Sequence, residues 1–320
     1  MRIAIIGGAG FIGSACANRL LQDPDLSVTV IDNFSSGRRW HLDLGLASGR
    51  MRVVAVDAAD LHALVDAIRD HELLYHFASN PDIAKAATEP TIDFSQGTLL
   101  SQNIFEAARL AQVPRVIYAS GSGVFGDNPS RVFVEQDFSP CPTSTYAASK
   151  AAGETLLSAY CHMFGLRGIS YRFANVVGPH QTHGVAYDFI NRLLKEPSRL
   201  SVMGNGSQTK SYIHVEDIVS GLTFFGTRFP ETYRCFNLTT DNQLTVREIA
   251  EMVIAELGLT GIPVDYGTTD KGWPGDVPVI RFSADKIKAL GWTPRYDSRE
   301  AMRQAIRGMI ANAKAGRFAR

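Results

Sequence analysis

The sequence predicts an α/β protein: a doubly wound parallel sheet followed by a smaller mixed α/β lobe. Three observations carry this prediction. A short apolar strand, Ile3–Ile6, ends in a glycine turn, further short strands alternate with helical segments, and the alternation loosens beyond about Asn175. Runs that are apolar throughout are typical of strands buried on both faces of a parallel sheet, with helices as the connections. We expect a first domain over residues 1–175, a second lobe over 176–320, and segments around 210–240 that return to the first domain.

The first strand leads into a turn, Gly7–Gly13, that reads Gly-Gly-Ala-Gly-Phe-Ile-Gly and opens a segment with helical spacing. In such a unit one glycine makes the turn, one lets backbone N–H groups reach a pyrophosphate, and one lets the helix pack on the strand. The free N–H groups and positive dipole end of the helix then face the anion. This is the pattern of a Rossmann dinucleotide-binding unit, and its candidate cofactor contacts are Gly7, Gly10, Phe11, Ile12 and Gly13.

The second strand, Leu26–Ile31, ends at Asp32. An acidic side chain there, about twenty residues past the glycines, can accept both ribose hydroxyls of an adenosine and repels a 2′-phosphate. We therefore expect NAD as the cofactor, although Arg38 and Arg39 follow closely and keep NADP as an alternative. The polar turn after Asp32 is expected to wrap the adenosine through Asn33, Ser35, Ser36 and Gly37.

The third and fourth strands also end in candidate cofactor residues. Met51–Val56 leads to Asp57, whose carboxylate either accepts from the adenine amino group or caps a helix expected over Leu61–Ile68. Leu73–Phe77 leads to small residues that let a pyrophosphate lie close to the backbone. The candidates at these two strand ends are Asp57, Ala58, Phe77, Ala78 and Ser79.

The fifth strand, Arg115–Ala119, follows a long helix expected over Thr91–Leu110 and breaks into a glycine- and serine-rich segment, Ser120–Gly126. Ligands bind at the carboxyl ends of the strands in an open parallel sheet, so this segment is expected at the site. His76, inside the fourth strand, is expected to be a hydrogen-bonded core residue.

Tyr146 and Lys150 are the main catalytic candidates. They lie one turn apart at the start of a helix expected over Tyr146–Phe164, which places them on the same face. A tyrosine has an ordinary pKa of about 10 and is a poor base at neutral pH, but a nearby ammonium and the positive nicotinamide of NAD⁺ favour the phenolate. Tyr146 is therefore the expected acid/base.

The composition excludes several function classes. The chain has 320 residues, with 32 Lys and Arg balancing 32 Asp and Glu, so no charge excess calls for a nucleic acid or an anionic membrane. No apolar run approaches membrane-spanning length, and Met1 leads directly into the first strand, so neither a membrane anchor nor a signal peptide is expected. The cysteines lack the close pairing of a zinc site, so no metal is expected. These features predict a cytoplasmic enzyme.

The motifs together resemble the extended short-chain dehydrogenase/reductases of the NAD-dependent nucleotide-sugar epimerase/dehydratase family, and their pattern is similar to that of UDP-glucose 4-epimerases. The resemblance covers nearly the whole chain. The segments that carry it are Gly7–Gly13, Asp32–Gly37, His76–Ser79, Tyr146–Lys150, Asn175–Pro179, Ser211–Val215 and Pro274–Pro278.

The resemblance implies an isomerase that acts on a UDP-hexose. Tyr146 would take the proton of the sugar 4-hydroxyl while the 4-hydride passes to NAD⁺, the 4-keto sugar would turn over, and the hydride would return to its other face. Lys150 would hold the nicotinamide ribose and tune Tyr146. The resemblance further implies diphosphate contacts by Asn175, Lys210 and Arg281, and a nucleobase beside Leu200, Ser201 and Val202.

Two positions depart from the family pattern. Gly121 stands where the family has a serine or threonine that binds the reacting sugar oxygen, and Ser122, ahead of Ser120, is the expected substitute. Trp273 stands where an arginine often binds the diphosphate, and Arg281 is the expected replacement. The Asp-Glu pair that 4,6-dehydratases of the family use for elimination is missing beside Gly121. A dehydratase, decarboxylase or reductase on the same fold stays open, as does a non-catalytic NAD-binding sensor.

The resemblance also implies a homodimer. The family pairs the helices expected here over Thr91–Leu110 and Tyr146–Phe164 into a four-helix bundle between subunits. The small and apolar residues expected on those faces are Ala107, Ala108, Leu156, Leu157 and Tyr160.

Overall fold

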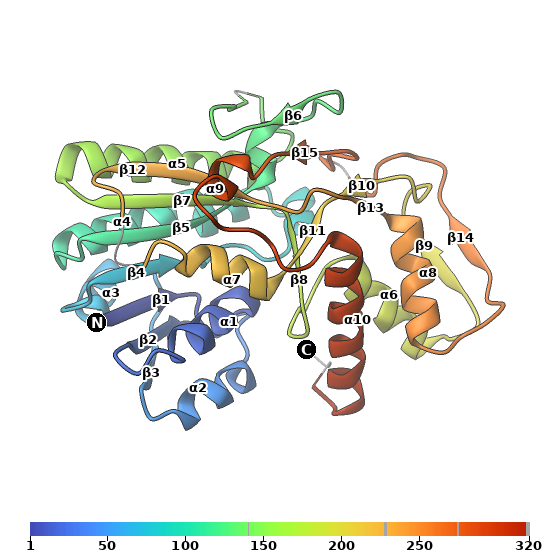
Figure 1. The fold of residues 1–320 in the computed structure, drawn as a ribbon, viewed down its shortest axis with the longest axis horizontal. Helices are drawn as coiled ribbons and strands as arrows, with labels where there is room; N and C mark the ends of the chain where they lie inside the picture. The colour runs from blue at the N-terminus through green and yellow to red at the C-terminus, as the bar shows by residue number, and fades with distance from the viewer. Residues whose placement is uncertain (140, 227–228, 274, 318–320) are drawn as a thin grey trace. The chain divides into compact units, whose positions relative to one another are not determined.

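The computed structural model describes residues 1–139, 141–226, 229–273 and 275–317 (Figure 1), so Pro274 of the last family motif lies outside the described residues. The chain forms two compact units. Unit 1 comprises Met1–Val124, Thr145–Phe173 and Val219–Phe236, and unit 2 comprises Phe125–Ser144, Ala174–Ile218 and Asn237–Arg320. The division differs from the expected one, since residues 125–144 group with unit 2 and the returning segment is 219–236.

A seven-stranded, mostly parallel sheet is the centre of unit 1, which confirms the doubly wound α/β fold (Figure 1). Its strands, in chain order, are β1 (Arg2–Ile6), β2 (Ser27–Asp32), β3 (Met51–Ala55), β4 (Leu73–His76), β5 (Arg115–Gly121), β7 (Arg167–Phe173) and β12 (Tyr233–Leu238). They lie in the order β12-β7-β5-β4-β1-β2-β3, so the chain reverses its direction of travel across the sheet between β1 and β4. Ligands of doubly wound sheets bind at such a switch point, outside the carboxyl ends of the strands.

Helices cover the sheet of unit 1. They are α1 (Phe11–Leu20), α2 (Asp43–Ala47), α3 (Leu61–Ile68), α4 (Leu100–Leu110) and α5 (Thr145–Phe164), with short helical turns η1 (Arg39–Leu42), η2 (Ile83–Ala87) and η4 (Ser122–Phe125). The segment η3 (Phe94–Leu99) is π-helical, so the helix expected over Thr91–Leu110 is wound differently in its first half. At its centre, a Cβ atom on Gly97 would lie 2.5 Å from Ser149 Oγ, which shows how closely η3 packs on α5.

Unit 2 is built from short strand pairs and three longer helices. The strands are β6 (Val132–Phe133), β8 (Asn175–Val177), β9 (Leu200–Val202), β10 (Thr209–Lys210), β11 (Tyr212–His214), β13 (Leu244–Thr245), β14 (Val264–Tyr266) and β15 (Arg281–Phe282). The helices are α6 (Val185–Lys195), α8 (Val246–Glu256), the short α9 (Asp285–Lys288) and α10 (Ser298–Lys314). Helix α7 (Val215–Thr223) begins in unit 2 and continues into unit 1. Apolar faces of α6, α8 and α10 form the core of this unit.

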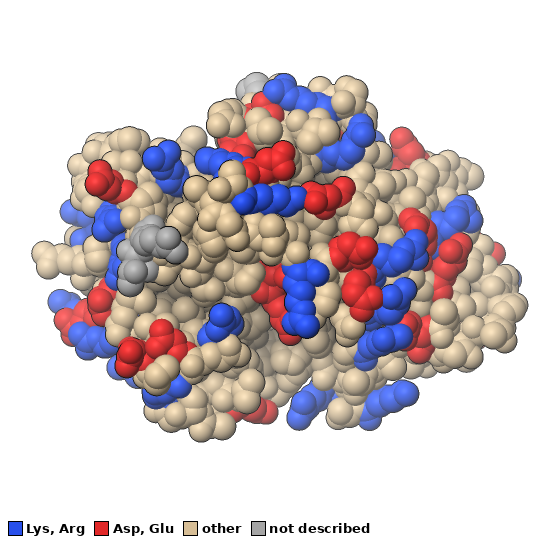
Figure 2. Space-filling view, viewed as in Figure 1, with Lys and Arg blue, Asp and Glu red and all other residues tan. Residues whose placement is uncertain are grey.

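The surface agrees with the balanced composition. Figure 2 shows lysine and arginine side chains interspersed with aspartate and glutamate, without a broad patch of one sign on the face it displays. Ion pairs also join α10 to α8, such as Arg307–Glu256 at 2.9 Å. Over the described ranges of the chain, every helix is too short or too polar to cross a membrane.

Candidate active site

The glycine turn after β1 forms a close-fitting cradle. Gly7 has φ of +76°, and a Cβ atom there would lie 2.7 Å from the backbone nitrogen of Ala78, which follows β4. A Cβ atom on Gly13 would lie 2.3 Å from the Gly7 carbonyl oxygen. Side chains at either position would therefore collide with backbone. The turn and the residues after β4 meet at the switch point of the sheet, as the sequence predicts for a pyrophosphate site.

The start of α1 is free to receive an anion. Gly10 is the N-cap residue and has no side chain to cap the helix, and the first turn contains no acidic residue. Phe11 and Ile12 open the helix, so their backbone N–H groups are among those that an α-helix cannot pair internally. Such N–H groups, together with the helix dipole, bind phosphate oxygens.

Asp32 is held at the end of β2 by backbone donors. The Ala9 N–H donates to its Oδ2 at 2.9 Å, and the Phe34 N–H donates to its Oδ1 at 2.8 Å. Burial raises the pKa of the Asp32 carboxyl, and these two hydrogen bonds oppose that rise. A Cβ atom on Gly37 would lie 2.8 Å from Asp32 Oδ1, so the polar turn folds directly over the carboxylate.

The hydrogen bonds around Asp57 show whether its carboxylate caps helix α3. The N-cap of α3 is Asp60, whose carboxylate accepts from the Ala63 N–H at 3.1 Å. Asp57 is therefore not the helix cap. Its carboxylate instead accepts from the Ala59 N–H at 2.9 Å and from the Asn33 side chain at 3.1 Å, which joins the turns after β2 and β3.

These features fit a bound dinucleotide. The cradle offers backbone N–H groups and no side chain where a pyrophosphate would lie, and a carboxylate stands where the adenosine ribose would lie. The remaining predicted cofactor residues surround the cradle: Asn33, Ser35, Ser36 and Asp57 are exposed, Phe77, Ala78 and Ser79 are half-buried, and Ala58 is buried.

His76 is a core residue, as predicted. Its Nε2 lies 2.9 Å from Ser101 Oγ, and the side chain is 1% exposed. Burial, and secondarily the charge of Lys150, hold the pKa of the His76 imidazole well below its usual value. A neutral imidazole sealed in this way takes no part in proton exchange with a ligand.

Tyr146 and Lys150 lie in the first turns of α5. The Lys150 ammonium is 5.5 Å from the centre of the Tyr146 ring and donates to the Ala119 carbonyl of β5 at 2.9 Å. The Ser79 side chain lies beside the Tyr146 hydroxyl and lowers its pKa by hydrogen bonding. The helix start, the end of β5 and the loop after β4 thus fix the two side chains together.

Two opposing effects set the charge states of this pair. Burial lowers the pKa of Lys150 to about 8, against the carboxylates of Asp93 and Glu154, which raise it. Burial and the charge of Asp93 raise the pKa of Tyr146 to about 12, while the Ser79 hydrogen bond lowers it. Without a cofactor Tyr146 therefore keeps its proton. The phenolate that the sequence analysis expects needs an additional positive charge.

The two candidate serines at the end of β5 differ in burial and in hydrogen bonding. Ser120 is 4% exposed, and its hydroxyl donates to the carboxylate of Glu154, which is also paired with Arg172 at 2.8 Å. Alternate strand residues face opposite sides of the sheet, so Ser120 points toward α5 and its hydroxyl is already bonded to Glu154. Ser122 opens η4, is half-buried, and its hydroxyl makes no hydrogen bond within the described residues.

Gly121 lies between these serines in open space. A Cβ atom added there would meet no heavy atom within 4 Å. The neighbouring Gly123 packs against α5, since a Cβ atom on it would lie 3.0 Å from the Cβ of Ala147. The segment is thus held against the start of α5, with room for a side chain at position 121.

The predicted diphosphate contacts in unit 2 already have partners on the chain. Lys210 Nζ lies 2.5 Å from Asp276 Oδ1, and the Arg281 guanidinium donates to the Pro129 carbonyl at 2.5 Å. The Asn175 side chain points to the Ser211 carbonyl at a long 3.4 Å. In β9, Leu200 and Val202 point into the core of unit 2, and Ser201 is exposed.

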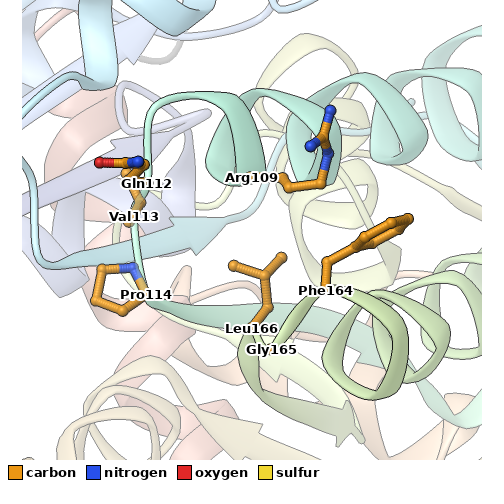
Figure 3. Close-up of a pocket in the computed structure, with 7 residues that line it drawn as sticks. All are labelled: Arg109, Gln112, Val113, Pro114, Phe164, Gly165 and Leu166. Carbon is orange, nitrogen blue, oxygen red and sulfur yellow. The ribbon is translucent and has the colours of Figure 1, made fainter.

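A separate hollow in unit 1 lies at the opposite ends of the strands (Figure 3). It measures about 490 Å³, and Arg109 from α4 and Phe164 from α5 flank it. Its lining residues are Arg109, Gln112, Val113, Pro114, Phe164, Gly165 and Leu166. They precede the amino ends of β5 and β7, so the hollow is not part of the cofactor cradle.

One buried group near the Tyr146–Lys150 pair was not predicted from the sequence. Asp93 is 1% exposed, and its two carboxylate oxygens accept from Asn80 Nδ2 at 2.9 Å and from Thr145 Oγ1 at 2.7 Å. An aspartate inside a segment with helical spacing gives no signal of this arrangement. The only indication in the sequence is that Asn80 and Thr145 adjoin the predicted site residues Ser79 and Tyr146.

Comparison with known proteins identifies the family. The family model "NAD dependent epimerase/dehydratase family" matches residues 3–238. The chain belongs to this family. As a member of this family of nucleotide-sugar epimerases and dehydratases, it uses NAD as its cofactor.

Individual relatives include both epimerases and dehydratases. The chain is 29% identical to a UDP-glucose 4-epimerase from Mycolicibacterium smegmatis over 96% of this chain and 97% of that protein. The crystal structure of a UDP-galactose 4-epimerase, 33% identical, matches with a TM-score of 0.86 and covers 98% of this chain and 99% of its own. A dTDP-glucose 4,6-dehydratase from Streptomyces venezuelae, with NAD bound, is 26% identical, has a TM-score of 0.90, and matches over 98% of each chain.

Proposed function

We propose that this family member is a UDP-hexose 4-epimerase that works through a transient 4-keto sugar. The observation that carries the proposal is the fixed pair of Tyr146 and Lys150 beside a strand-end segment that contains no carboxylate. Epimerisation needs one group that takes and returns the proton of the 4-hydroxyl, and Tyr146 Oη is the group placed to do so. Bound NAD⁺ supplies the acceptor for the sugar C4 hydride and its later donor.

Lys150 prepares Tyr146 for proton removal. Its ammonium stands 5.5 Å from the Tyr146 ring, and its Nζ has donor capacity beyond the bond to the Ala119 carbonyl. We assign that capacity to the ribose hydroxyls next to the nicotinamide. Positive charge near Tyr146 stabilises the phenolate, which opposes the rise in pKa that burial and Asp93 produce.

The strand-end segment argues against dehydration. Removing water from a hexose needs an acid and a base in addition to the proton-transfer group at the 4-hydroxyl. Residues 121–123 are Gly-Ser-Gly, and neither glycine nor serine supplies a carboxyl group for that task. Ser122, with its hydroxyl uncommitted, is the proposed hydrogen-bond partner of the reacting sugar oxygen.

For the nucleotide, we propose that Asn175, Lys210 and Arg281 bind the diphosphate and that the β9 segment, Leu200–Val202, binds the base. The backbone and Ser201 would make the base contacts, because the Leu200 and Val202 side chains are in the core. The cations suit an anionic diphosphate by charge.

We also propose that the enzyme is a homodimer through the α4 and α5 helices, but on other side chains than predicted. Ala107, Ala108, Leu157 and Tyr160 are buried in the core of unit 1, and Leu156 is half-buried against it. The exposed apolar side chains on η3, α4 and α5 are Phe94, Leu99, Leu110, Met163 and Phe164. A monomer in light scattering at micromolar concentration would contradict this assignment.

The direct test is incubation of the NAD-loaded protein with UDP-glucose, UDP-galactose and their N-acetyl and uronic acid counterparts, followed by proton NMR of the sugar. We expect interconversion of one C4 epimer pair. A 4-keto-6-deoxy product would identify a dehydratase. No change in any sugar would contradict the proposal.

A further inference from the structure

The loop after β4 and the start of α5 are joined by one buried carboxylate. Asp93 directly precedes η3 and is 1% exposed. It accepts from Asn80 Nδ2 at 2.9 Å and from Thr145 Oγ1 at 2.7 Å. Both donors are uncharged, and within the described ranges of the chain Asp93 forms no ion pair.

The two donors stand next to the two groups that meet at the proposed catalytic site. Asn80 follows Ser79, whose side chain lies beside the Tyr146 hydroxyl and lowers its pKa. Thr145 precedes Tyr146 and is the first residue of α5. Displacing the Asp93 carboxylate would therefore release both the loop that carries Ser79 and the helix start that carries Tyr146.

A buried carboxylate without a cation in direct contact carries a large desolvation penalty. The surrounding fold supports it at several points. Asn80 is itself fixed, because it donates to the Asp82 carbonyl at 2.9 Å and accepts from the Asp82 N–H at 3.0 Å. On the other side, η3 packs so closely on α5 that Gly97 leaves no room for a side chain against Ser149. π-Helical turns occur frequently at functional sites, and η3 directly follows Asp93.

We propose that Asp93 is a positioning residue for the Tyr146–Lys150 pair, which it holds in place through its hydrogen bonds with Asn80 and Thr145. The mechanistic role assigned here rests on the proposed function, because it concerns the same proton transfer. The hydrogen bonds of Asp93 with Asn80 and Thr145 lie within unit 1 and do not involve a substrate.

The charge of Asp93 acts on both members of the pair in the same direction. It raises the pKa of Lys150, against burial, and it raises the pKa of Tyr146 together with burial. Removing that charge should lower both pKa values. Other titratable groups face the pair from β4, β5, α5 and β7; they are His76, Tyr118, Glu154 and Arg172.

Those other groups do not give the same response. His76 is neutral because burial lowers its pKa, and Tyr118 is neutral because burial raises its pKa. The Glu154 carboxylate is shared with Arg172. A titration shift that follows substitution of Asp93 can therefore be assigned to Asp93.

The first experiment measures the titration of Lys150 itself, without substrate. Protein labelled with ¹³C at the lysine ε-carbon is titrated by NMR, and Lys150→Met identifies the resonance. In Asp93→Asn, which keeps the size of the side chain, we expect the Lys150 midpoint to fall by on the order of one pH unit. The matched control is Asp82→Asn, which neutralises an exposed carboxylate of the same segment and should leave the midpoint unchanged.

The second experiment measures turnover. Asp93→Asn should lower kcat about tenfold with KM within about twofold, and should move the pH profile of kcat to lower pH, because both pKa values fall. Thr145→Val should lower kcat about three- to tenfold, and Thr145→Ser, which restores the hydroxyl, should recover it. These paired variants remain informative if Asp93→Asn does not fold.

An unshifted Lys150 midpoint in folded Asp93→Asn overturns the inference, and so does wild-type kcat in Thr145→Val. If the wild-type protein epimerises no UDP-hexose, the proposed function fails, but the Lys150 titration still decides the electrostatic role of Asp93.

Discussion

The proposed catalytic groups of unit 1 and the proposed diphosphate-binding groups of unit 2 are prepared in opposite ways. Lys150 is held by a hydrogen bond to the Ala119 carbonyl, and its ammonium lies 5.5 Å from the centre of the Tyr146 ring. Lys210 is instead paired with the Asp276 carboxylate, and the Arg281 guanidinium donates to the Pro129 carbonyl. The proposed proton-transfer groups are thus preorganised, whereas a bound diphosphate would have to compete with acceptors that the chain already provides.

The largest expected effect tests the preorganised half. Tyr146→Phe keeps the ring and removes only the hydroxyl, so turnover should fall by about two to four orders of magnitude while NAD binding is unchanged. Tyr160→Phe, which removes a hydroxyl from the same helix, is the control and should leave turnover near the wild-type value. Epimer formation is followed by NMR and NAD binding by calorimetry. Comparable turnover in Tyr146→Phe and wild type would remove Tyr146 from the mechanism.

Burial of Lys150 should also be visible in the pH dependence of stability. The unfolded lysine binds its proton up to pH 10.5 and the folded one only up to about pH 8, so the unfolded chain binds more protons between these values. The free energy of unfolding of the wild type, relative to that of Lys150→Met, should therefore increase by about 3 kcal/mol as pH rises through this window. Chemical denaturation of the cofactor-free proteins at pH 7 and pH 10 measures it. A difference that stays constant with pH would contradict the buried ammonium.

The cofactor cradle gives an intermediate effect. Asp32→Ala removes the acceptor for the adenosine ribose, so NAD affinity should fall about 10- to 100-fold, as for loss of hydrogen bonds to a charged group, and the preference over NADP should relax. Calorimetric titration with both cofactors measures this. Tighter binding of NADP than of NAD to the wild-type protein would show that Asp32 does not select the cofactor.

A smaller effect is expected in unit 2. Lys210→Met should raise KM for the UDP-sugar about tenfold with kcat within about twofold, because the lysine contributes to binding only after it leaves Asp276. Lys271→Met changes an exposed lysine of the same unit and serves as the control. If Lys210→Met lowers kcat and leaves KM unchanged, the assignment of Lys210 to the diphosphate is wrong.

The smallest effect concerns the strand-end segment. Ser122→Ala should lower single-turnover rates about tenfold, as for loss of one transition-state hydrogen bond worth about 1.4 kcal/mol. Gly121→Ser adds a hydroxyl where the structure leaves open space, so it should fold normally and partly restore the rate in the Ser122→Ala background. Wild-type rates in Ser122→Ala, together with no gain from Gly121→Ser, would show that Tyr146 works without a serine partner.

The sequence predicts the parts of the site that depend on local patterns. The cradle of Gly7 and Gly13, the placement of Asp32 at a strand end, and the spacing of Tyr146 and Lys150 follow from strand and helix periodicity. The side on which Ser120 points needs the register of β5, and the location of Asp93 needs the tertiary packing of η3 against α5. The partners of Lys210 and Arg281 depend on contacts between segments far apart in the chain, which no local pattern encodes.

The most direct test of the central claim uses a UDP-hexose labelled with deuterium at C4, incubated with the NAD-loaded enzyme at the pH optimum. If the fixed Tyr146–Lys150 pair supports reversible oxidation at C4, the product is the C4 epimer and deuterium stays on its C4, because only the hydroxyl proton passes through Tyr146. A product that lacks oxygen at C6, or an epimer whose deuterium has been lost to water, would contradict the account.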